Sequence, residues 1–304
     1  MNVDTRLSVL MSVYRKDDPG FLREALESLE QQTMLAEEIV IVVDGPVSAE
    51  LNEILDEFAT RYTSGRTILH RLAENQGLAS AMNTGLALAT MPLVARMDSD
   101  DYCDPYRFER QLAYLAQHPD TGCVATIQAE FETDPRVIVS EKGVPATHDK
   151  IAKALAFRNV ISHPSIMFRR DLVVAAGGYR TDVGLLEDYE LHLRLLLQGV
   201  RYAGIQEPLI RVRISPQQRF RRGGWKYMRN EWALRYECYR RGQLPWIAFW
   251  IATPLTSLFR LSPVWLKKLA YGLVRRPTPK QLPPQPASNR GAYLRETVAS
   301  NDAC

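Results

Sequence analysis

Four carboxylates lie within seven residues of the chain, at Asp98, Asp100, Asp101 and Asp104, directly after an apolar run that ends at Met97. Carboxylates this close repel one another, so a cation, a helix terminus or solvent must offset their charge. Mg²⁺ and Mn²⁺ prefer carboxylate oxygens, and one or two carboxylates often hold such an ion together with substrate phosphates. Asp98 and Asp100 form a D-x-D pair that, at a strand end, can hold the ion and reach a diphosphate through it.

Three alternative roles for this acidic cluster remain open. Asp104 precedes Pro105, a pairing that is typical of a helix N-cap followed by proline at the first helical position. The spacing from Asp98 to Glu109 resembles part of a calcium loop, but Cys103 stands where that loop needs glycine, and a strand precedes it. A solvated turn is the third alternative.

Polar side chains at three other positions could also contact a ligand. Asp44 precedes Gly45 and follows an apolar run, so it either accepts hydrogen bonds from a base or ribose or forms a simple Asp-Gly turn. Asn75 and Asn83 lie in a stretch of small residues, where they could contact a ligand or only cap and pack a helix. No G-x-G-x-x-G follows the first strand and G-x-x-x-x-G-K-[ST] is absent, which argues against a dinucleotide cofactor and a phosphate loop.

Another acidic pair begins the stretch EDYELHLRLLLQ, which has the spacing of an amphipathic helix. Glu187 and Asp188 would stand in its first turn, where the helix dipole favours negative charge. Most such pairs only stabilise a helix. The functional alternative is a general base, because a carboxylate held ionised there can take the proton of an attacking hydroxyl group.

Apolar runs alternate with helical patterns through the first half of the chain. This alternation predicts an α/β fold in which a mostly parallel sheet is flanked by helices. Buried strands are expected at residues 7–13, 38–43, 67–72 and 92–97. Ligands bind beyond the carboxyl ends of such strands, so the residues that follow the strand ends should converge on one crevice: Tyr14, Asp44, Asn75 and Asp98.

The composition narrows the classes of function. A net charge of +3 over 304 residues is too small to predict nucleic-acid binding. The four cysteines are scattered and form no C-x-x-C pair, which favours a reduced, cytosolic setting over a disulfide framework or a zinc site. The N-terminal segment has an acidic residue before its short apolar run, so we interpret it as a first strand and not as a signal peptide.

The C-terminal third combines basic, aromatic and apolar segments. Basic residues dominate from Arg219 to Arg241, and the segment from Leu244 to Phe259 carries no charge. That segment is shorter than the ~20 apolar residues of a membrane span. With the aromatic and basic residues up to 276, it predicts a helical region on a membrane surface, where the basic region faces an anionic leaflet. A helix pair buried against the core is the alternative, and the polar tail 277–304 is expected to be disordered.

These motifs occur in an order that resembles the family 2 glycosyltransferases with the GT-A fold. The resemblance extends from about Arg6 to Ser215 and rests on the segments SVLMSVYRKDD, IVIVVDG, NQGLASAMNTGL, ARMDSDDYCDPYRFERQ, HPSIMFRRDL, GGYRTDVGLLEDYELHLRLLLQG and PLIRVRIS. It implies an inverting enzyme that moves a sugar from a nucleoside-diphosphate sugar to a hydroxyl group. The Q-x-x-R-W signature of processive synthases is absent, so we expect one sugar per encounter.

The resemblance implies roles for individual residues on the donor side. Tyr14 would lie against the nucleotide base, Asp44 would face the base or ribose, and Asp98 would contact the nucleotide sugar. Asn75 is assigned to the same donor site. Asp100 would hold a divalent cation, Mn²⁺ or Mg²⁺, on the diphosphate.

On the acceptor side, the resemblance makes Asp188 the catalytic base and assigns Glu187 and His163 to the acceptor site. The expected organisation is a nucleotide-sugar-binding half, an acceptor-binding half, a membrane-associating helical region and a tail, at residues 1–110, 111–215, 216–276 and 277–304 respectively. The membrane-associating part of the helical region would be 244–276.

The acceptor would be a saccharide or a polyprenyl-linked saccharide, presented at the inner face of the cell membrane during O-antigen, capsule or exopolysaccharide biosynthesis. Two alternatives come from other classes: a nucleotidyltransferase of sugar phosphates that uses the same acids, and a non-catalytic, membrane-associated assembly protein. The segment SVYRKDD lacks the glycines of the basic loop that a nucleotidyltransferase would carry near its N-terminus.

Overall fold

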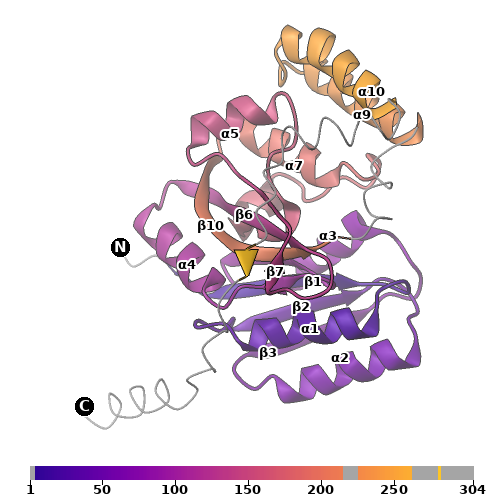
Figure 1. Cartoon of the computed structure of the whole chain (residues 1–304), viewed down its shortest axis with the longest axis vertical. Helices are drawn as coiled ribbons and strands as arrows, with labels where there is room; N and C mark the ends of the chain where they lie inside the picture. The colour runs from indigo at the N-terminus through magenta and orange to yellow at the C-terminus, as the bar shows by residue number, and fades with distance from the viewer. Residues whose placement is uncertain (1–3, 215–224, 262–279, 282–304) are drawn as a thin grey trace.

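The chain folds around a nine-stranded sheet (Figure 1). Its structure is a computed structural model that describes residues 4–214, 225–261 and 280–281. The strand order is β3-β2-β1-β4-β9-β6-β10-β5, and β8 pairs with β6. The strands of this sheet are β1 (Leu7–Val13), β2 (Glu38–Val43), β3 (Arg66–Arg71), β4 (Leu93–Asp98), β5 (Tyr102–Cys103), β6 (Thr121–Phe131), β8 (Ser140–Lys142), β9 (Met167–Arg169) and β10 (Arg201–Arg213). The helices are α1 (Pro19–Glu30), α2 (Ala49–Arg61), α3 (Leu78–Leu88), α4 (Arg107–Gln117), α5 (His148–Leu155), α6 (Arg170–Ala175), α7 (Glu187–Leu197), α9 (Trp225–Arg240) and α10 (Thr253–Leu261), with the short turns η1 (His163–Ser165) and η2 (Ala248–Ala252).

The predicted parallel sheet is confirmed in the first half of the chain. Strands β1, β2, β3 and β4 pair in parallel, and each lies within one residue of its predicted bounds. The second half is mixed, because β9 runs antiparallel to both β4 and β6 while β10 runs parallel to β6. The carboxyl ends of β1, β2 and β4 therefore meet at one edge, as the sequence predicts.

Side chains of the central strands alternate between two helical layers, as the pleat of a strand requires. Leu10 and Val40 belong to the buried cluster that contains α3, whereas Val9 and Ile39 belong to the cluster that contains α1 and α2. Figure 1 shows α1 and α2 on one face of the sheet and α5, α7, α9 and α10 toward the opposite end of the molecule. Because both faces are covered, β2 is buried at every residue.

Side chains cap the first two helices, whereas the N-cap predicted at Asp104 is wrong. The Asp18 carboxylate accepts the N–H groups of the first turn of α1, and the Ser48 hydroxyl accepts one in α2. Asp104 does not cap α4, which begins at Arg107 after a turn. Its carboxylate accepts the N–H of Tyr106 within that turn, at 3.2 Å.

The C-terminal helices pack on the end of the molecule formed by α5 and α7 (Figure 1). Their inner face joins the main core through Leu234, Cys238, Leu244 and Ala248. The sequence led us to expect that the basic region 219–241 faces a membrane surface. Arg235 is buried instead, so this part of the region does not face outward. In the described ranges, up to 261 and at 280–281, no helix has the length and apolar character to span a membrane.

The predicted tail is described at two residues. Lys280 and Gln281 form a short strand, β11, which pairs antiparallel with β7 (Val137–Ile138). The rest of 277–304 lies outside the described residues, as do 262–276, which were expected to complete the membrane-associating region.

Arg107 is fully buried at the start of α4 and joins three elements. Its Nη2 donates to the carbonyl oxygen of Arg96 in β4, at 2.9 Å, and to that of Ile166, at 3.2 Å. Ile166 directly follows η1. Arg107 therefore fixes the position of η1 relative to the strand that ends in the acidic cluster.

Replacing Arg107 by methionine should destabilise the fold. The change removes the donor from the Arg96 carbonyl oxygen and from Gln111 Oε1, whereas the Ile166 oxygen keeps the N–H of Arg96 at 3.1 Å. Each group that is left unsatisfied costs about 1–3 kcal/mol. We expect the free energy of unfolding, measured in urea, to fall by about 2–5 kcal/mol. Arg110→Met is the matched control on the same helix, because Arg110 is 52% exposed, and it should change stability by less than about 0.5 kcal/mol. Equal effects of the two changes would contradict this role.

Candidate active site

The acidic cluster lies where β4 ends, at the predicted edge of the sheet. Carboxylate oxygens of Asp98, Asp100 and Asp101 lie within 4.8 Å of one another. The sequence predicted Asp98 and Asp100 as the ligand pair, and the structure adds Asp101. Three carboxylates that offer oxygens around one point can hold a divalent cation such as Mn²⁺ or Mg²⁺.

Arginines offset part of this negative charge. Arg96, buried in β4, forms an ion pair with Asp98. The backbone N–H of Arg213 donates to Asp101 Oδ1 at 3.0 Å, and its Nε donates to the carbonyl oxygen of Asp100 at 3.1 Å. The fourth acid of the sequence cluster points elsewhere, because Asp104 pairs with Arg211 at 2.6 Å.

Arg213 is held by aromatic rings as well as by hydrogen bonds. Its guanidinium carbon lies 3.8 Å from the ring centre of Phe21 in α1 and 4.5 Å from that of Phe131 in β6. Its Nη2 also forms an ion pair with Glu24. Cation–π contacts of this kind are stronger when the cation is desolvated. The last residue of β10 thereby connects the acidic loop to α1 and β6.

The remaining charge at the cluster is unfavourable without a cation. Burial, together with the charges of Asp98 and Asp17, raises the pKa of Asp100 to about 6. Burial and the charges of Asp100 and Asp98 raise the pKa of Asp101 well above its ordinary value. Asp101 Oδ2 is buried and accepts no hydrogen bond from the residues that the structure describes. A buried carboxylate oxygen that lacks a donor is a suitable ligand for a metal ion.

The turn after β1 is tied to the acidic loop by Asp17, a residue that the motifs of the sequence do not point to. Asp17 Oδ2 accepts the N–H of Tyr14 at 3.1 Å and the hydroxyl of Ser99 at 2.7 Å. Tyr14 is therefore brought to the same edge as the acidic cluster. The signal that could have identified Asp17 is that it follows β1, the strand that pairs with β4. Its partner Ser99 cannot be inferred from the spacing of the sequence.

Asp44 and Asn75 lie side by side because they hydrogen-bond to each other. Asn75 Nδ2 donates to Asp44 Oδ2 at 2.8 Å, and the N–H groups of Gln76 and Gly77 donate to the Asp44 carboxylate at 2.7 and 2.9 Å. Asp44 is buried. The Asp-Gly turn is also present, with Gly45 at φ +83°. Asp44 thus fixes the loop that precedes α3.

The predicted acidic helix start is confirmed, since α7 begins at Glu187. Asp188 Oδ1 accepts the N–H of Tyr189 at 2.7 Å, and Asp188 Oδ2 accepts Asn159 Nδ2 at 2.9 Å. Glu187 is buried beside it. Both oxygens of Asp188 accept hydrogen bonds, which hold the carboxylate in one orientation.

Tyr179 lies between the acidic cluster and the start of α7. Burial raises the pKa of its phenol, and Arg96 lowers that pKa while Asp188 raises it further, so both charges act on this hydroxyl. His163 Nε2 lies 3.0 Å from the Tyr179 hydroxyl, and His163 is itself buried. His163 therefore contacts the hydroxyl on which the charge of Asp188 acts.

The side chain of Asn83, which we considered as a ligand contact, pairs with the backbone of Tyr179. Its side-chain nitrogen donates to the carbonyl oxygen of Tyr179, and its side-chain oxygen accepts the Tyr179 N–H, each at 2.7 Å. An added Cβ at Gly178 would lie 2.4 Å from Asn83 Oδ1, so glycine is needed for this approach. Asn83 instead anchors the segment that carries Tyr179.

The chain is similar to known sugar-transferring proteins. The profile of "Glycosyl transferase family 2" matches residues 8–174. The amylovoran biosynthesis glycosyltransferase AmsE of Erwinia amylovora is 34% identical over 87% of this chain and 97% of its own length. The UDP-Gal:alpha-D-GlcNAc-diphosphoundecaprenol beta-1,3-galactosyltransferase of Escherichia coli is 35% identical over 91% of this chain and 99% of its own.

A solved structure supports the same fold. The mannosyltransferase of Pyrobaculum calidifontis, in complex with GDP-Man and Mn²⁺, is 19% identical, with a TM-score of 0.60 over 98% of this chain and 81% of that chain. This likeness confirms the predicted GT-A fold.

Asp100→Asn should stabilise the metal-free protein at pH 7.5. Folding raises the pKa of Asp100 to about 6, so its ionised form costs folding free energy above that pH, and the cost disappears as the pH falls toward 4. Removing the charge should therefore gain about 1–3 kcal/mol, seen as a higher melting temperature. The same variant should lose most of the rise in melting temperature that Mn²⁺ produces in the wild type.

The matched control for this change is Asp104→Asn. It breaks the pair with Arg211, so it should lower the melting temperature and leave the response to Mn²⁺ intact. A wild-type response retained in Asp100→Asn, or a lower stability of that variant without metal, would contradict the site.

Proposed function

This chain belongs to glycosyl transferase family 2, and we propose that it transfers a single sugar from a nucleoside-diphosphate sugar to a hydroxyl group of a saccharide acceptor, with inversion at the anomeric carbon. The observation that carries this proposal is the arrangement of Asp98, Asp100 and Asp101 around one point at the end of β4. A divalent cation held there would offset the negative charge that develops on the departing diphosphate.

The residues at the strand ends form the donor side. Asp98 contacts the nucleotide sugar, and Tyr14 lies against the base. Asp44 and Asn75 contribute by fixing the loop before α3, with which they share hydrogen bonds. This division of roles keeps the donor on the rigid parallel part of the sheet, where positioning a substrate is most effective.

Asp188 is the general base on the acceptor side. It takes the proton of the acceptor hydroxyl as the oxygen attacks the anomeric carbon from the face opposite the diphosphate, and the bond to the diphosphate breaks in the same displacement. Its two hydrogen bonds hold the carboxylate in one orientation. Glu187 and His163, which are buried near it, form the wall that receives the acceptor.

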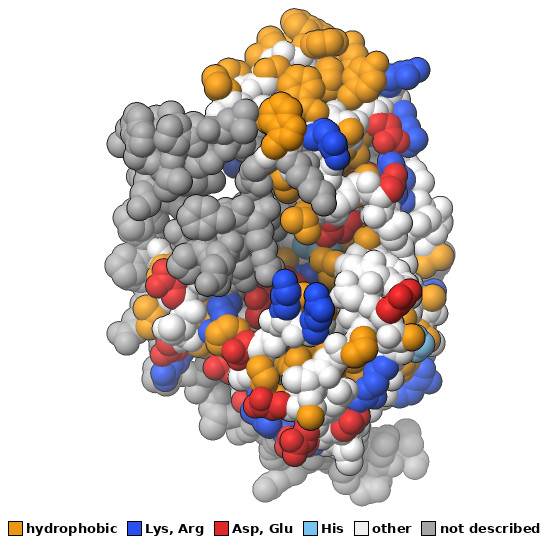
Figure 2. All heavy atoms as spheres, turned by 90° about the vertical axis from the view of Figure 1, so that its right-hand side faces the viewer, with side chains coloured by type: hydrophobic (Ala, Val, Ile, Leu, Met, Phe, Trp, Pro, Cys, Tyr) orange, Lys and Arg blue, Asp and Glu red, His pale blue; other side chains and the backbone are white. Residues whose placement is uncertain are grey.

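The acceptor is a lipid-linked saccharide of a bacterial surface polysaccharide, by similarity to the Escherichia coli and Erwinia amylovora relatives. A membrane-bound substrate suits the outer face of the C-terminal helices. Figure 2 shows hydrophobic side chains gathered at that end of the molecule. This apolar patch consists of Trp246, Ile247, Trp250, Ile251, Leu255 and Leu258.

The apolar patch has the character of an interfacial segment. Trp250 is 56% exposed and Leu258 is 69% exposed, while Phe249 next to Trp250 is buried in the core. Arg240 and Arg241, which are exposed at the end of α9, supply positive charge nearby. Tryptophan side chains and arginines favour the headgroup region of an anionic bilayer. We place this patch on the inner face of the cell membrane.

Asp188→Asn should abolish transfer and leave donor binding intact. Loss of a general base typically lowers the rate ~10²–10⁴-fold. The measurement is release of the nucleoside diphosphate from UDP-galactose, UDP-GlcNAc or GDP-mannose with a GlcNAc-diphospholipid acceptor, together with the thermal shift by UDP or GDP and Mn²⁺. Asp182→Asn, an exposed acid before the same helix, is the control and should keep its activity. Normal turnover in Asp188→Asn would remove the base assignment.

Trp250→Glu with Leu258→Glu should release the protein from membranes. Two charges in the apolar patch oppose burial among headgroups and acyl chains. Flotation with vesicles that contain phosphatidylglycerol should recover the wild type and not the double variant. Val174→Glu, at a 46% exposed site on α6, should float as the wild type does. If the wild type stays at the bottom of the gradient, the membrane surface assignment is wrong.

A further inference from the structure

Arg235 is the most connected side chain of the C-terminal helices that the structure describes. It is 2% exposed, and each of its three guanidinium nitrogens donates hydrogen bonds. The acceptors are Thr253 Oγ1 (2.6 Å), the Tyr189 hydroxyl (2.9 Å), and the carbonyl oxygens of Ala248 (2.7 Å), Phe157 (3.1 Å) and Ala156 (3.2 Å). A buried arginine with this many partners is fixed in place.

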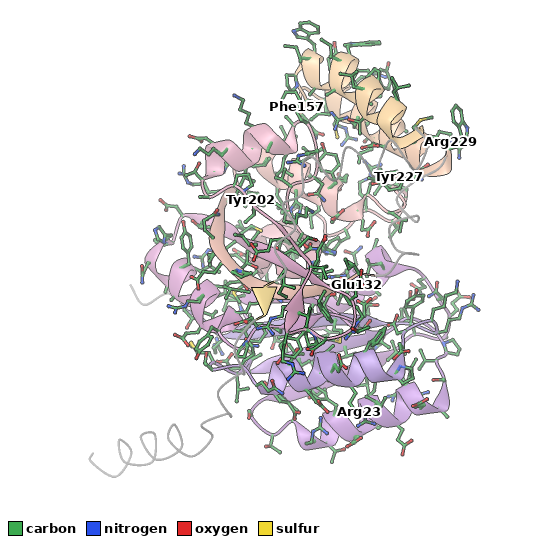
Figure 3. The ribbon with its side chains drawn as sticks, viewed as in Figure 1. Arg23, Glu132, Phe157, Tyr202, Tyr227 and Arg229 are labelled. Carbon is green, nitrogen blue, oxygen red and sulfur yellow. The ribbon has the colours of Figure 1, made fainter. Side chains whose placement is uncertain are left out.

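Three of these partners, Tyr189, Ala156 and Phe157, belong to segments that lead to the predicted base. Tyr189 is the neighbour of Asp188, and its hydroxyl donates to the carbonyl oxygen of Leu155 at 2.7 Å. Three successive carbonyl groups at the end of α5, from 155 to 157, are therefore held by Tyr189 and Arg235. Figure 3 shows the labelled Phe157 beside the C-terminal helices.

The segment that Arg235 holds leads directly to Asn159. Asn159 Nδ2 donates to Asp188 Oδ2 at 2.9 Å, and Asn159 Oδ1 accepts the N–H of Ile161 at 3.1 Å. Arg235 thus supports Asp188 by two routes, through Tyr189 in α7 and through the segment that carries Asn159. Both routes start in a helix that lies beyond the residues matched by the family profile.

We propose that Arg235 is a positioning residue for the catalytic carboxylate, so that the C-terminal helices complete the active site as well as contacting the membrane. The inference rests on the function proposed above for Asp188. The guanidinium acts by fixing Asn159 and Tyr189, and thereby the orientation of the Asp188 carboxylate toward the acceptor hydroxyl.

Arg235→Lys and Tyr189→Phe test the proposal through kinetics. A misplaced base lowers turnover, and we expect kcat to fall about 10–100-fold. The KM for the nucleotide sugar should stay within about twofold, because the change is remote from the donor side. Arg229→Lys is the matched control, since Arg229 is exposed on the same helix, away from Phe157 in Figure 3. A wild-type kcat in both Arg235→Lys and Tyr189→Phe would overturn the proposal.

A double-mutant cycle with Asn159→Ala tests the route. If Arg235 acts through Asn159, the Arg235→Lys/Asn159→Ala double variant should have a kcat close to that of the worse single variant. Independent, multiplicative losses would overturn the route. If Arg235→Lys does not fold, Tyr189→Phe, which removes one hydroxyl group, takes its place in the cycle.

Hydrogen exchange gives a readout that needs no substrate. The Ile161 N–H should exchange faster in Arg235→Lys than in Arg229→Lys, since its acceptor on Asn159 is less fixed. Unchanged protection there would count against the proposal. Failure of the base assignment can be told apart from failure of the Arg235 proposal. An active Asp188→Asn variant would reject the base assignment. An inactive Asp188→Asn variant, together with fully active Arg235→Lys and Tyr189→Phe variants, would reject the role of Arg235 alone.

Discussion

Mutual repulsion among Asp98, Asp100 and Asp101 is the constraint around which the donor side is arranged. Two unit charges about 4 Å apart interact by about 4 kcal/mol where the effective dielectric constant is near 20. The fold offsets only part of this, through the ion pair of Arg96 with Asp98 and the N–H of Arg213 on Asp101. Burial, together with the remaining repulsion from Asp98 and Asp17, raises the pKa of Asp100. A bound cation would remove that electrostatic cost, and its positive charge would attract a diphosphate.

The acceptor side depends on orientation instead of repulsion. Asp188 is held by a helix N–H and by Asn159, and the elements that carry these groups are joined by Tyr189 and Arg235. Tyr179 stands between the two sides, where Arg96 and Asp188 both act on its hydroxyl. Under the proposed function, the parallel strands supply the donor site, and the mixed second half with the C-terminal helices supplies the base and its support.

Sequence periodicity predicted the features that depend on neighbouring residues. The strands of the first half and the start of α7 follow from local patterns. The contacts of the arginines did not: Arg235 belongs by sequence to the basic region and Arg213 ends the strand before it, yet their partners lie far away in the chain and bury them. Asp104 was predicted as a cap because proline follows it, but Arg211, 107 residues away, takes its carboxylate. Long-range pairing of this kind leaves no local signal.

The claim that the rest depends on is that Asp98, Asp100 and Asp101 hold a cation that binds the donor's diphosphate. Anomalous diffraction from crystals grown with Mn²⁺ and a nucleoside diphosphate tests it most directly. We expect one manganese peak at coordination distance from oxygens of these carboxylates and from the diphosphate. A diphosphate bound with no manganese at the cluster, or a manganese ion bound elsewhere with these carboxylates turned away, would contradict it.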